Sequence, residues 1–249
     1  MDGTIVDHDG RLTEPVRAAV AAVVEAGIHV VVATGRSLHG TLPVLEQLGL
    51  FEGWAVCSNG SVTLRLDPAS PGGYRVVDEV TFDPSPALRL LREHLPVAAY
   101  AVEDVGLGYR LTAPFPIGEL TGDQRIVPFD QLLHTPATRV IVRSPEHSSQ
   151  DFLDLTAAIG LHGVNYAVGW TAWLDLAPDG VSKASALEGV RGRLGVPADA
   201  TMAVGDGRND LEMFAWAARA VAMGNAFEEV KAAADAVVPG VLDDGLALA

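Results

Sequence analysis

The chain has 249 residues, enough for one large or two modest domains with a buried core. Hydrophobic residues make up 49% of it, which excludes an intrinsically disordered chain. Its 17 Lys and Arg against 32 Asp and Glu give a formal net charge of −15, which disfavours nonspecific nucleic-acid binding.

Cysteine usage and hydropathy indicate where such a protein works. The single cysteine, Cys57, excludes an internal disulfide bond and lies in an apolar run, so a buried thiol is favoured over a nucleophile. No basic-then-apolar leader opens the sequence, and no apolar run approaches the length of a transmembrane helix. We therefore predict a cytoplasmic protein without membrane or nucleic-acid partners. Its oligomeric state is not predicted by the sequence.

The first part of the chain alternates apolar strands with helices. The predicted elements are a helix at 14–26, a strand at 28–33, a helix from 37 to about 48 and a strand at 54–57. Polar turns follow both strands, Thr34-Gly35-Arg36-Ser37 and Ser58-Asn59-Gly60. This βαβαβ rhythm predicts a doubly wound parallel sheet.

The pattern changes in the middle and then returns. A hairpin at 61–66 and 74–80 precedes an α+β segment with helices at 86–94 and 151–159 and strands near 97–103, 108–112, 138–143 and 164–168. Strands at 173–177, 202–206, 221–223 and 236–238 then alternate with helices at 183–194, 210–218 and 226–234. We predict a core domain in two parts, 1–82 and 173–249, interrupted by a smaller α+β domain at 83–172.

The stretch Met-Ala-Val-Gly-Asp-Gly-Arg-Asn-Asp at 202–210 reads as a buried strand with a polar tip. Its Asp206, Asn209 and Asp210 lie where open α/β sheets bind ligands, at the carboxyl end of a strand. Together with Asp2, these oxygen-rich tips are suited to a hard cation such as Mg²⁺. The alternative is an ordinary turn at Asp206 followed by a helix cap at Asn209 or Asp210.

Four separated motifs resemble, in order and spacing, the haloacid dehalogenase superfamily of phosphohydrolases. They are Asp2-Gly3-Thr4, Thr34-Gly35-Arg36, Lys183 and Gly205-Asp206-Gly207-Arg208-Asn209-Asp210. The Cof-type, sugar-phosphatase-like branch is the most similar, since its larger cap domain lies between the second and third motifs. Three more stretches look like that branch: Ser58-Asn59-Gly60, Gly180-Val181-Ser182-Lys183 and Ala222-Met223-Gly224-Asn225-Ala226.

The resemblance implies a fold and a reaction. The fold is a doubly wound parallel, Rossmann-like core sheet interrupted by an α+β cap that selects the substrate. The reaction is Mg²⁺-dependent hydrolysis of small phosphorylated metabolites, sugar phosphates above all, through an aspartyl-phosphate. Asp2 stands at the general acid and base position, and its backbone carbonyl would bind Mg²⁺ beside the carboxylate of Asp206. Asp210 would support the metal or orient Lys183.

The same resemblance implies a phosphate site made of Thr34, Gly35, Arg36, Lys183 and Asn209, with Thr34 and Lys183 also counted as catalytic. Thr34 can equally cap a helix, which is compatible with binding an anion. Arg36 is otherwise a surface charge, and Asn209 a helix cap. Lys183 starts a helix, where its charge opposes the helix dipole, and this poor local placement favours a functional role.

The printed sequence departs from the family pattern Asp-x-Asp-Gly-Thr, because Met1 stands at x. The nucleophilic aspartate and the central strand that delivers it in the family are therefore not in the printed chain. We expect the true start to lie upstream. The alternatives are a noncatalytic pseudoenzyme that binds phosphometabolites, and a phosphomutase with the same aspartyl-phosphate chemistry.

Near the end of the middle segment, Tyr166, Trp170 and Trp173 are interpreted as core aromatics, with stacking on a sugar as the alternative.

Overall fold

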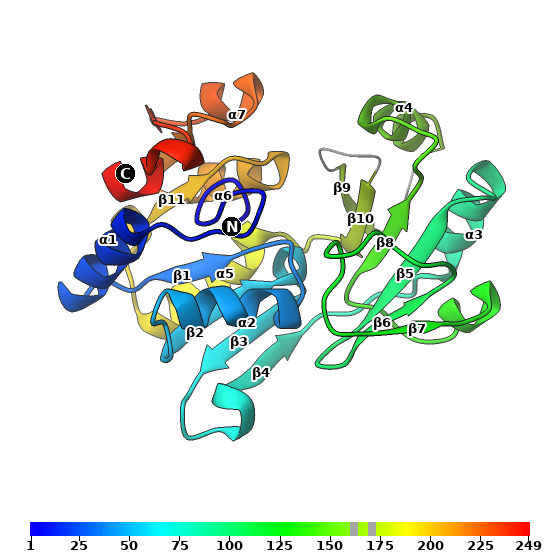
Figure 1. Cartoon of the computed structure of the whole chain (residues 1–249), viewed down its shortest axis with the longest axis horizontal. Helices are drawn as coiled ribbons and strands as arrows, with labels where there is room; N and C mark the ends of the chain where they lie inside the picture. The colour runs from blue at the N-terminus through cyan, green and yellow to red at the C-terminus, as the bar shows by residue number, and fades with distance from the viewer. Residues whose placement is uncertain (160–163, 169–172) are drawn as a thin grey trace. The chain divides into compact units, whose positions relative to one another are not determined.

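The computed structural model describes residues 1–159, 164–168 and 173–249. The chain splits into two compact units. The first unit comprises Met1–Gly35, Thr41–Asp78 and Ser182–Ala249, and the second comprises Arg36–Gly40 and Glu79–Val181. In Figure 1 the first unit runs from blue to cyan and again from yellow to red, while most of the second is green. The predicted boundary at 172 and the aromatic Trp170 lie outside the described residues.

The first unit contains two sheets. One has the order β1-β2-β3-β4, with β1 and β2 parallel and β3 antiparallel to β2. The other, β11-β12-β13, is parallel throughout. Their bounds are β1 (Val31–Ala33), β2 (Gly53–Cys57), β3 (Val62–Leu66), β4 (Tyr74–Glu79), β11 (Met202–Gly205), β12 (Arg219–Met223) and β13 (Ala236–Val238).

The predicted α/β class, with parallel strands and helices, is confirmed. The predicted single core sheet is instead divided in two within the described residues. The first residues of the chain do not pair with either sheet in a ladder; they form one isolated bridge, Asp2 to Val6. The carbonyl oxygen of Met1 accepts the N–H groups of Thr4, Ile5 and Val6, so this segment satisfies its hydrogen bonds by turning on itself.

Helices join the two sheets of the first unit into one hydrophobic core. Val56 of β2, Leu187 and Val190 of α5, Ala203 of β11 and Phe214 of α6 belong to a single buried cluster. The helices are α1 (Glu14–Glu25), α2 (Leu38–Gln47), α5 (Lys183–Leu194), α6 (Leu211–Trp216) and α7 (Glu228–Ala232), and two 3₁₀ turns used below are Ser58–Gly60 and Arg208–Asp210. Because α5 packs on both sheets, the side chains of its first turn, which begins at Lys183, have a fixed position relative to both.

The start of α5 is defined by its sequence. Ser182 adopts an extended conformation at the N-cap, and its hydroxyl accepts the N–H of Ser185. The hydroxyl of Ser185 in turn accepts the N–H of Ser182, which completes a capping box. Gly195 ends the helix in the left-handed conformation, as glycine commonly does. The predicted helix at 183–194 is therefore correct in both bounds.

The second unit is a six-stranded sheet with the order β7-β6-β5-β8-β10-β9. Its pairs are antiparallel except β6 with β7. The elements are α3 (Ser85–His94), β5 (Ala99–Asp104), β6 (Gly108–Leu111), β7 (Asp123–Ile126), β8 (Val140–Arg143), α4 (Ser149–Ile159), β9 (Val164–Val168) and β10 (Trp173–Pro178). Sequence analysis did not predict β7, because all four of its residues are exposed and show no alternating apolar pattern. No helix among the described residues is long and apolar enough to cross a bilayer.

A buried polar network lies on one face of this sheet. The guanidinium of Arg139 pairs with the carboxylate of Asp175, with Nε–Oδ1 at 2.6 Å and Nη2–Oδ2 at 3.1 Å. Arg139 Nη1 also donates to the hydroxyl of Tyr109 at 3.2 Å, and Trp173 Nε1 donates to Asp175 Oδ2 at 2.9 Å. Trp173 further contacts Phe115 edge to face. Each polar group is thus satisfied inside the fold, which makes the network costly to open.

We expect Asp175→Ala to lower the free energy of unfolding by about 3–5 kcal/mol, because it leaves the buried charge of Arg139 without its partner. Denaturant unfolding followed by circular dichroism measures this. The matched control is Glu14→Ala, which breaks the exposed pair with Arg17 and should cost about 1 kcal/mol or less. Equal losses for the two variants would contradict the argument.

Burial raises the pKa of Tyr109 to about 12. Since this lies above the value of about 10 expected in the unfolded chain, the contribution of Tyr109 to stability is complete below pH 10 and falls as the pH rises toward 12. Tyrosinate absorbance of the wild type minus that of Tyr109→Phe should show this late titration. A difference curve centred near pH 10 would contradict it.

Candidate active site

A buried ion pair links the helix α5 to the turn after β11. Lys183 Nζ donates to Asp210 Oδ1 at 2.6 Å, and both side chains are only 4% exposed. Lys183 is one of two lysines in the sequence. Asp210 Oδ2 accepts the backbone N–H groups of Asp206 and Gly207, each at 2.9 Å. Burial opposes the ionisation of Asp210, but the Lys183 ammonium and these bonds outweigh it and lower its pKa. The carboxyl group of Asp210 is therefore ionised at neutral pH.

A second carboxylate, Asp206, is buried beside this pair. Its Oδ1 accepts the hydroxyl hydrogen of Thr4 at 2.6 Å, and its Oδ2 lies over the Cα of Gly3, which has a φ of +72°. A side chain at position 3 would collide with that oxygen, so glycine is required there. Burial raises the pKa of Asp206, against the opposing charge of the Met1 ammonium and the hydrogen bond from Thr4. Ionising this carboxylate therefore depends on nearby positive charge.

The chain's own α-amino group lies in the same cluster. Met1 is buried, and burial together with the Lys183 ammonium lowers the pKa of its amino group, while Asp210 and Asp206 act in the opposite direction. The amino group of Met1 and two carboxyl groups some 200 positions away in the sequence thus share one buried region.

The turn after β2 connects the remaining phosphate-site candidates. Asn59 Oδ1 accepts from Asn209 Nδ2 at 2.9 Å, and the N–H of Asn59 donates to the carbonyl of Thr34 at 3.0 Å. The amide of Asn59 also lies against Gly35, where a Cβ atom would come within 2.9 Å of Oδ1. Thr34 is buried directly after β1. Thr34, Gly35 and Asn209 are therefore held together through one residue, Asn59.

Two predicted residues are placed differently. The side chain of Asp2 is exposed, whereas its neighbours Met1 and Gly3 are buried. Arg36 falls in the second unit, where its Nη1 donates to the carbonyl of Gly40 at 3.2 Å within the first turn of α2. The structure thus groups six of the eight candidates, Thr34, Gly35, Lys183, Asp206, Asn209 and Asp210, through hydrogen bonds and close packing in the first unit.

The donor set permits a magnesium ion but limits which residues bind it. No three His, Cys, Asp or Glu side chains in the described part of the chain are placed around one point. Mg²⁺ does not need such a cage, because it binds one or two protein oxygens together with water and phosphate. Asp206 suits this role because burial raises the pKa of its carboxyl group, and a nearby cation would favour the ionised form. Both oxygens of Asp210 are already engaged, which favours the predicted alternative that it orients Lys183.

Three residues of this region belong to the sequence motifs described above but were not predicted as site residues: Thr4, Asn59 and Asn225. Asn225 Nδ2 donates to the carbonyl of Gly3 at 2.9 Å, and its Oδ1 accepts the N–H of Val241 at 2.8 Å. Asn225 follows β12 as Asp206 follows β11, so the rule that selects polar residues after parallel strands could have found it. The same rule could have found Asn59, which follows β2, whereas the bond of Thr4 leaves no signal in the sequence.

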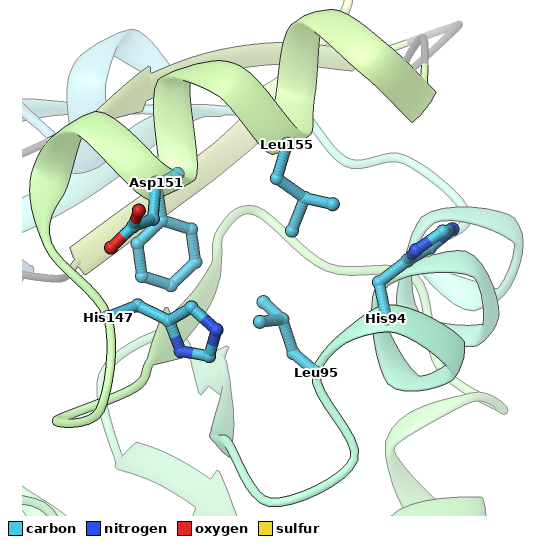
Figure 2. A pocket seen from close by; sticks show the side chains of 6 residues that line it. His94, Leu95, His147, Asp151 and Leu155 are labelled. Carbon is cyan, nitrogen blue, oxygen red and sulfur yellow. The ribbon is translucent and has the colours of Figure 1, made fainter.

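A pocket of about 220 Å³ lies in the second unit, and none of the candidates lines it. Figure 2 shows His94 and Leu95 at the end of α3 across from His147 and the α4 residues Asp151 and Leu155. The ring of His147 bonds to Ser144 at 2.7 Å, and the carboxylate of Asp151 accepts from Ser148. These polar groups already have partners within their own turn.

Comparison with known proteins bears on this arrangement. The family model of haloacid dehalogenase-like hydrolases matches residues 1–85 and 119–249. The Streptococcus pyogenes protein M6_Spy0533 is 30% identical over 99% of this chain and 93% of its own length. Phosphatase YwpJ of Bacillus subtilis is 26% identical over 95% of the chain and 92% of its length, and HMP-PP phosphatase of Serratia proteamaculans is 27% identical over 93% and 84%.

Solved structures agree on the fold. A haloacid dehalogenase-like hydrolase from B. subtilis superposes with a TM-score of 0.82 at 22% identity, covering 99% of this chain and 95% of that one. The subclass IIB sugar phosphatase BT4131 gives a TM-score of 0.83 at 21% identity, covering 100% and 94%.

The chain belongs to the haloacid dehalogenase-like hydrolase family. The resemblance that the motifs indicated is confirmed, including its Cof-type branch, and so is the fold of a core with an inserted cap.

We expect Lys183→Met to lower the free energy of unfolding by about 3–5 kcal/mol, since it strands the buried charge of Asp210. The double variant Lys183→Met/Asp210→Asn removes that charge as well and should lose less than the single variant. Denaturant unfolding of the two single variants and the double variant forms a cycle that measures the coupling. Losses that simply add would contradict a direct interaction.

Proposed function

We propose that this protein is a Mg²⁺-dependent phosphoric monoester hydrolase that acts on small phosphorylated metabolites, sugar phosphates above all. The observation that carries the proposal is the buried ammonium of Lys183, held by Asp210 beside a second buried carboxylate. In a chain with a net charge of −15, a fixed buried cation is what a phosphate ester requires. Membership of a hydrolase family and relatives that are named phosphatases support the reaction type.

The roles follow from charge and position. Lys183 neutralises charge on the transferring phosphoryl group. The hydrogen bond to Asp210 holds the Lys183 ammonium in place. Thr34 supplies a hydroxyl, and Gly35 an N–H, where phosphate oxygens would bind, with the amide of Asn209 on the other side. Positioning and charge neutralisation account for most of the catalysis of phosphoryl transfer.

The carboxylate of Asp206 and the backbone carbonyl of Asp2 would hold Mg²⁺. Asp210 would support Asp206 by accepting the backbone N–H of Asp206. When bound, Mg²⁺ supplies positive charge to the phosphate oxygens. The carboxyl group of Asp2 gives its proton to the leaving alcohol and takes a proton from the attacking water, which contributes about 10²–10⁴-fold to the rate.

In the family pattern the nucleophile is an aspartate that directly precedes the position of Met1. We propose that turnover requires such a residue, which forms an aspartyl-phosphate that water then hydrolyses. Without it, the site would bind phosphate esters but not cleave them. We also propose a cytoplasmic location, on the basis of the single buried thiol.

The decisive experiment measures phosphate release from p-nitrophenyl phosphate and from a panel of sugar phosphates, with and without Mg²⁺. It compares the printed chain with a version extended at Met1 by an apolar strand ending in Asp. We expect Mg²⁺-dependent release by the extended version. Binding without release by both versions would favour the noncatalytic alternative, and exchange of phosphosugar isomers with little free phosphate would favour a mutase.

In the active version we expect Lys183→Ala to lower kcat by about 10²–10³-fold, because it removes preorganised charge at the phosphoryl group. The matched control is Lys231→Ala, which removes the other lysine, an α7 residue paired with Glu228. Steady-state kinetics with both variants measures the difference. Comparable rates for the two variants would count against a catalytic role for Lys183.

A further inference from the structure

Three consecutive residues after β2 have a backbone conformation that side chains disfavour. The φ angles are +50° at Ser58, +55° at Asn59 and +109° at Gly60. In the described chain the other residue besides glycine with a positive φ is Asp244. Ser58 and Asn59 are also buried. Such conformations persist where the surroundings determine them, and they gather at sites where the strain has a use.

The surroundings of this turn are the three loops of the candidate site. The N–H of Asn59 donates to the Thr34 carbonyl, and the N–H of Thr34 donates to the Val56 carbonyl at 2.9 Å. The side-chain oxygen of Asn59 accepts from Asn209. The turn thus joins the end of β1 to the turn after β11, although no ladder connects these two strands in the described residues.

Two glycines allow the close approach. A Cβ at Gly35 would lie 2.9 Å from Asn59 Oδ1 and 3.3 Å from its Nδ2, so the amide packs directly on the backbone of Gly35. A Cβ at Gly60 would lie 2.2 Å from the carbonyl oxygen of Ser182, the residue before Lys183. The turn therefore contacts the backbone of Gly35 beside Thr34, the backbone of Ser182 beside Lys183, and the side chain of Asn209.

We propose that Asn59 is a positioning residue for phosphate: its amide fixes the distance between the Thr34-Gly35 backbone and the amide of Asn209. This inference rests on the proposed function, since it assumes that phosphate binds at Thr34 and Asn209. The left-handed backbone conformation of Asn59 places its side-chain amide between Gly35 and Asn209. Asparagine tolerates this conformation better than most residues and supplies the acceptor that Asn209 needs.

Glycine and alanine at position 59 separate this role from a merely structural one. Both substitutions remove the amide, but glycine adopts a positive φ without strain, whereas alanine does not. Asn59→Ala should therefore melt about 2–6 °C below Asn59→Gly. A purely structural residue would lose phosphate affinity only in proportion to this loss of stability.

The experiment measures the dissociation constant of inorganic phosphate by calorimetry at saturating Mg²⁺, together with the melting temperature, for the protein and its variants. We expect Asn59→Gly and Asn59→Ala to weaken binding alike, by about 3- to 10-fold. Asn209→Ala should weaken it similarly, and adding it to Asn59→Gly should cost little more, because both remove one interaction. The control is Asp244→Gly, which changes another left-handed residue, bonded to Thr13, and should leave phosphate affinity unchanged.

The outcomes separate the two proposals. If the unaltered protein does not bind inorganic phosphate, the proposed function fails and the inference fails with it. If it binds phosphate and Asn59→Gly binds equally well, the inference alone is overturned. Weakened binding by Asn59→Ala that tracks its melting temperature, with normal binding by Asn59→Gly, also overturns it.

Discussion

The buried contact between Lys183 and Asp210 is the interaction on which the rest of the site depends. Removing two charges from water is costly, and the contact is tolerated because every oxygen of Asp210 has a partner. Two of those partners are backbone N–H groups of the turn after β11, and the third is the Lys183 ammonium. One carboxylate therefore both shapes the turn and holds the ammonium in place. The position of Asp206 follows, since its own N–H is one of the groups that Asp210 binds.

The first unit builds this arrangement from loops that follow parallel strands. Thr34 follows β1, Asn59 follows β2, Asp206 follows β11 and Asn225 follows β12. Each side chain is short and polar, and those of Asn59, Asp206 and Asn225 each bond to the backbone or side chain of another loop. Such cross-links between loops compensate for the lack of a continuous ladder between the two sheets within the described residues.

Sequence reasoning recovered the parts of this structure that have a periodic or positional signal. The helix at 183–194 and the strand at 236–238 were predicted with correct bounds, because caps and apolar runs mark them. The acidic tip at Asp206 was found because it ends an apolar strand. The pairing of Lys183 with Asp210 was offered only as one of two roles, since residues 27 positions apart in sequence carry no sign of contact.

Other features were invisible for physical reasons. The edge strand at 123–126 is exposed on both faces and so lacks the alternation that marks a strand. The division of the core strands into two sheets depends on hydrogen bonds that composition does not encode. The left-handed conformation of Ser58 and Asn59 was also not predicted, because only the glycine after them suggests it.

The exposed strand β7 has a consequence for how the protein behaves among many copies of itself. As the last strand in its sheet it presents main-chain donors and acceptors on its outer side, the kind of template on which another chain can be added. Asp123 and Arg125 stand on it two residues apart, so a neighbouring strand would have to strip water from both charges. The cost of desolvating these charges therefore disfavours the addition of another strand at this edge of the sheet.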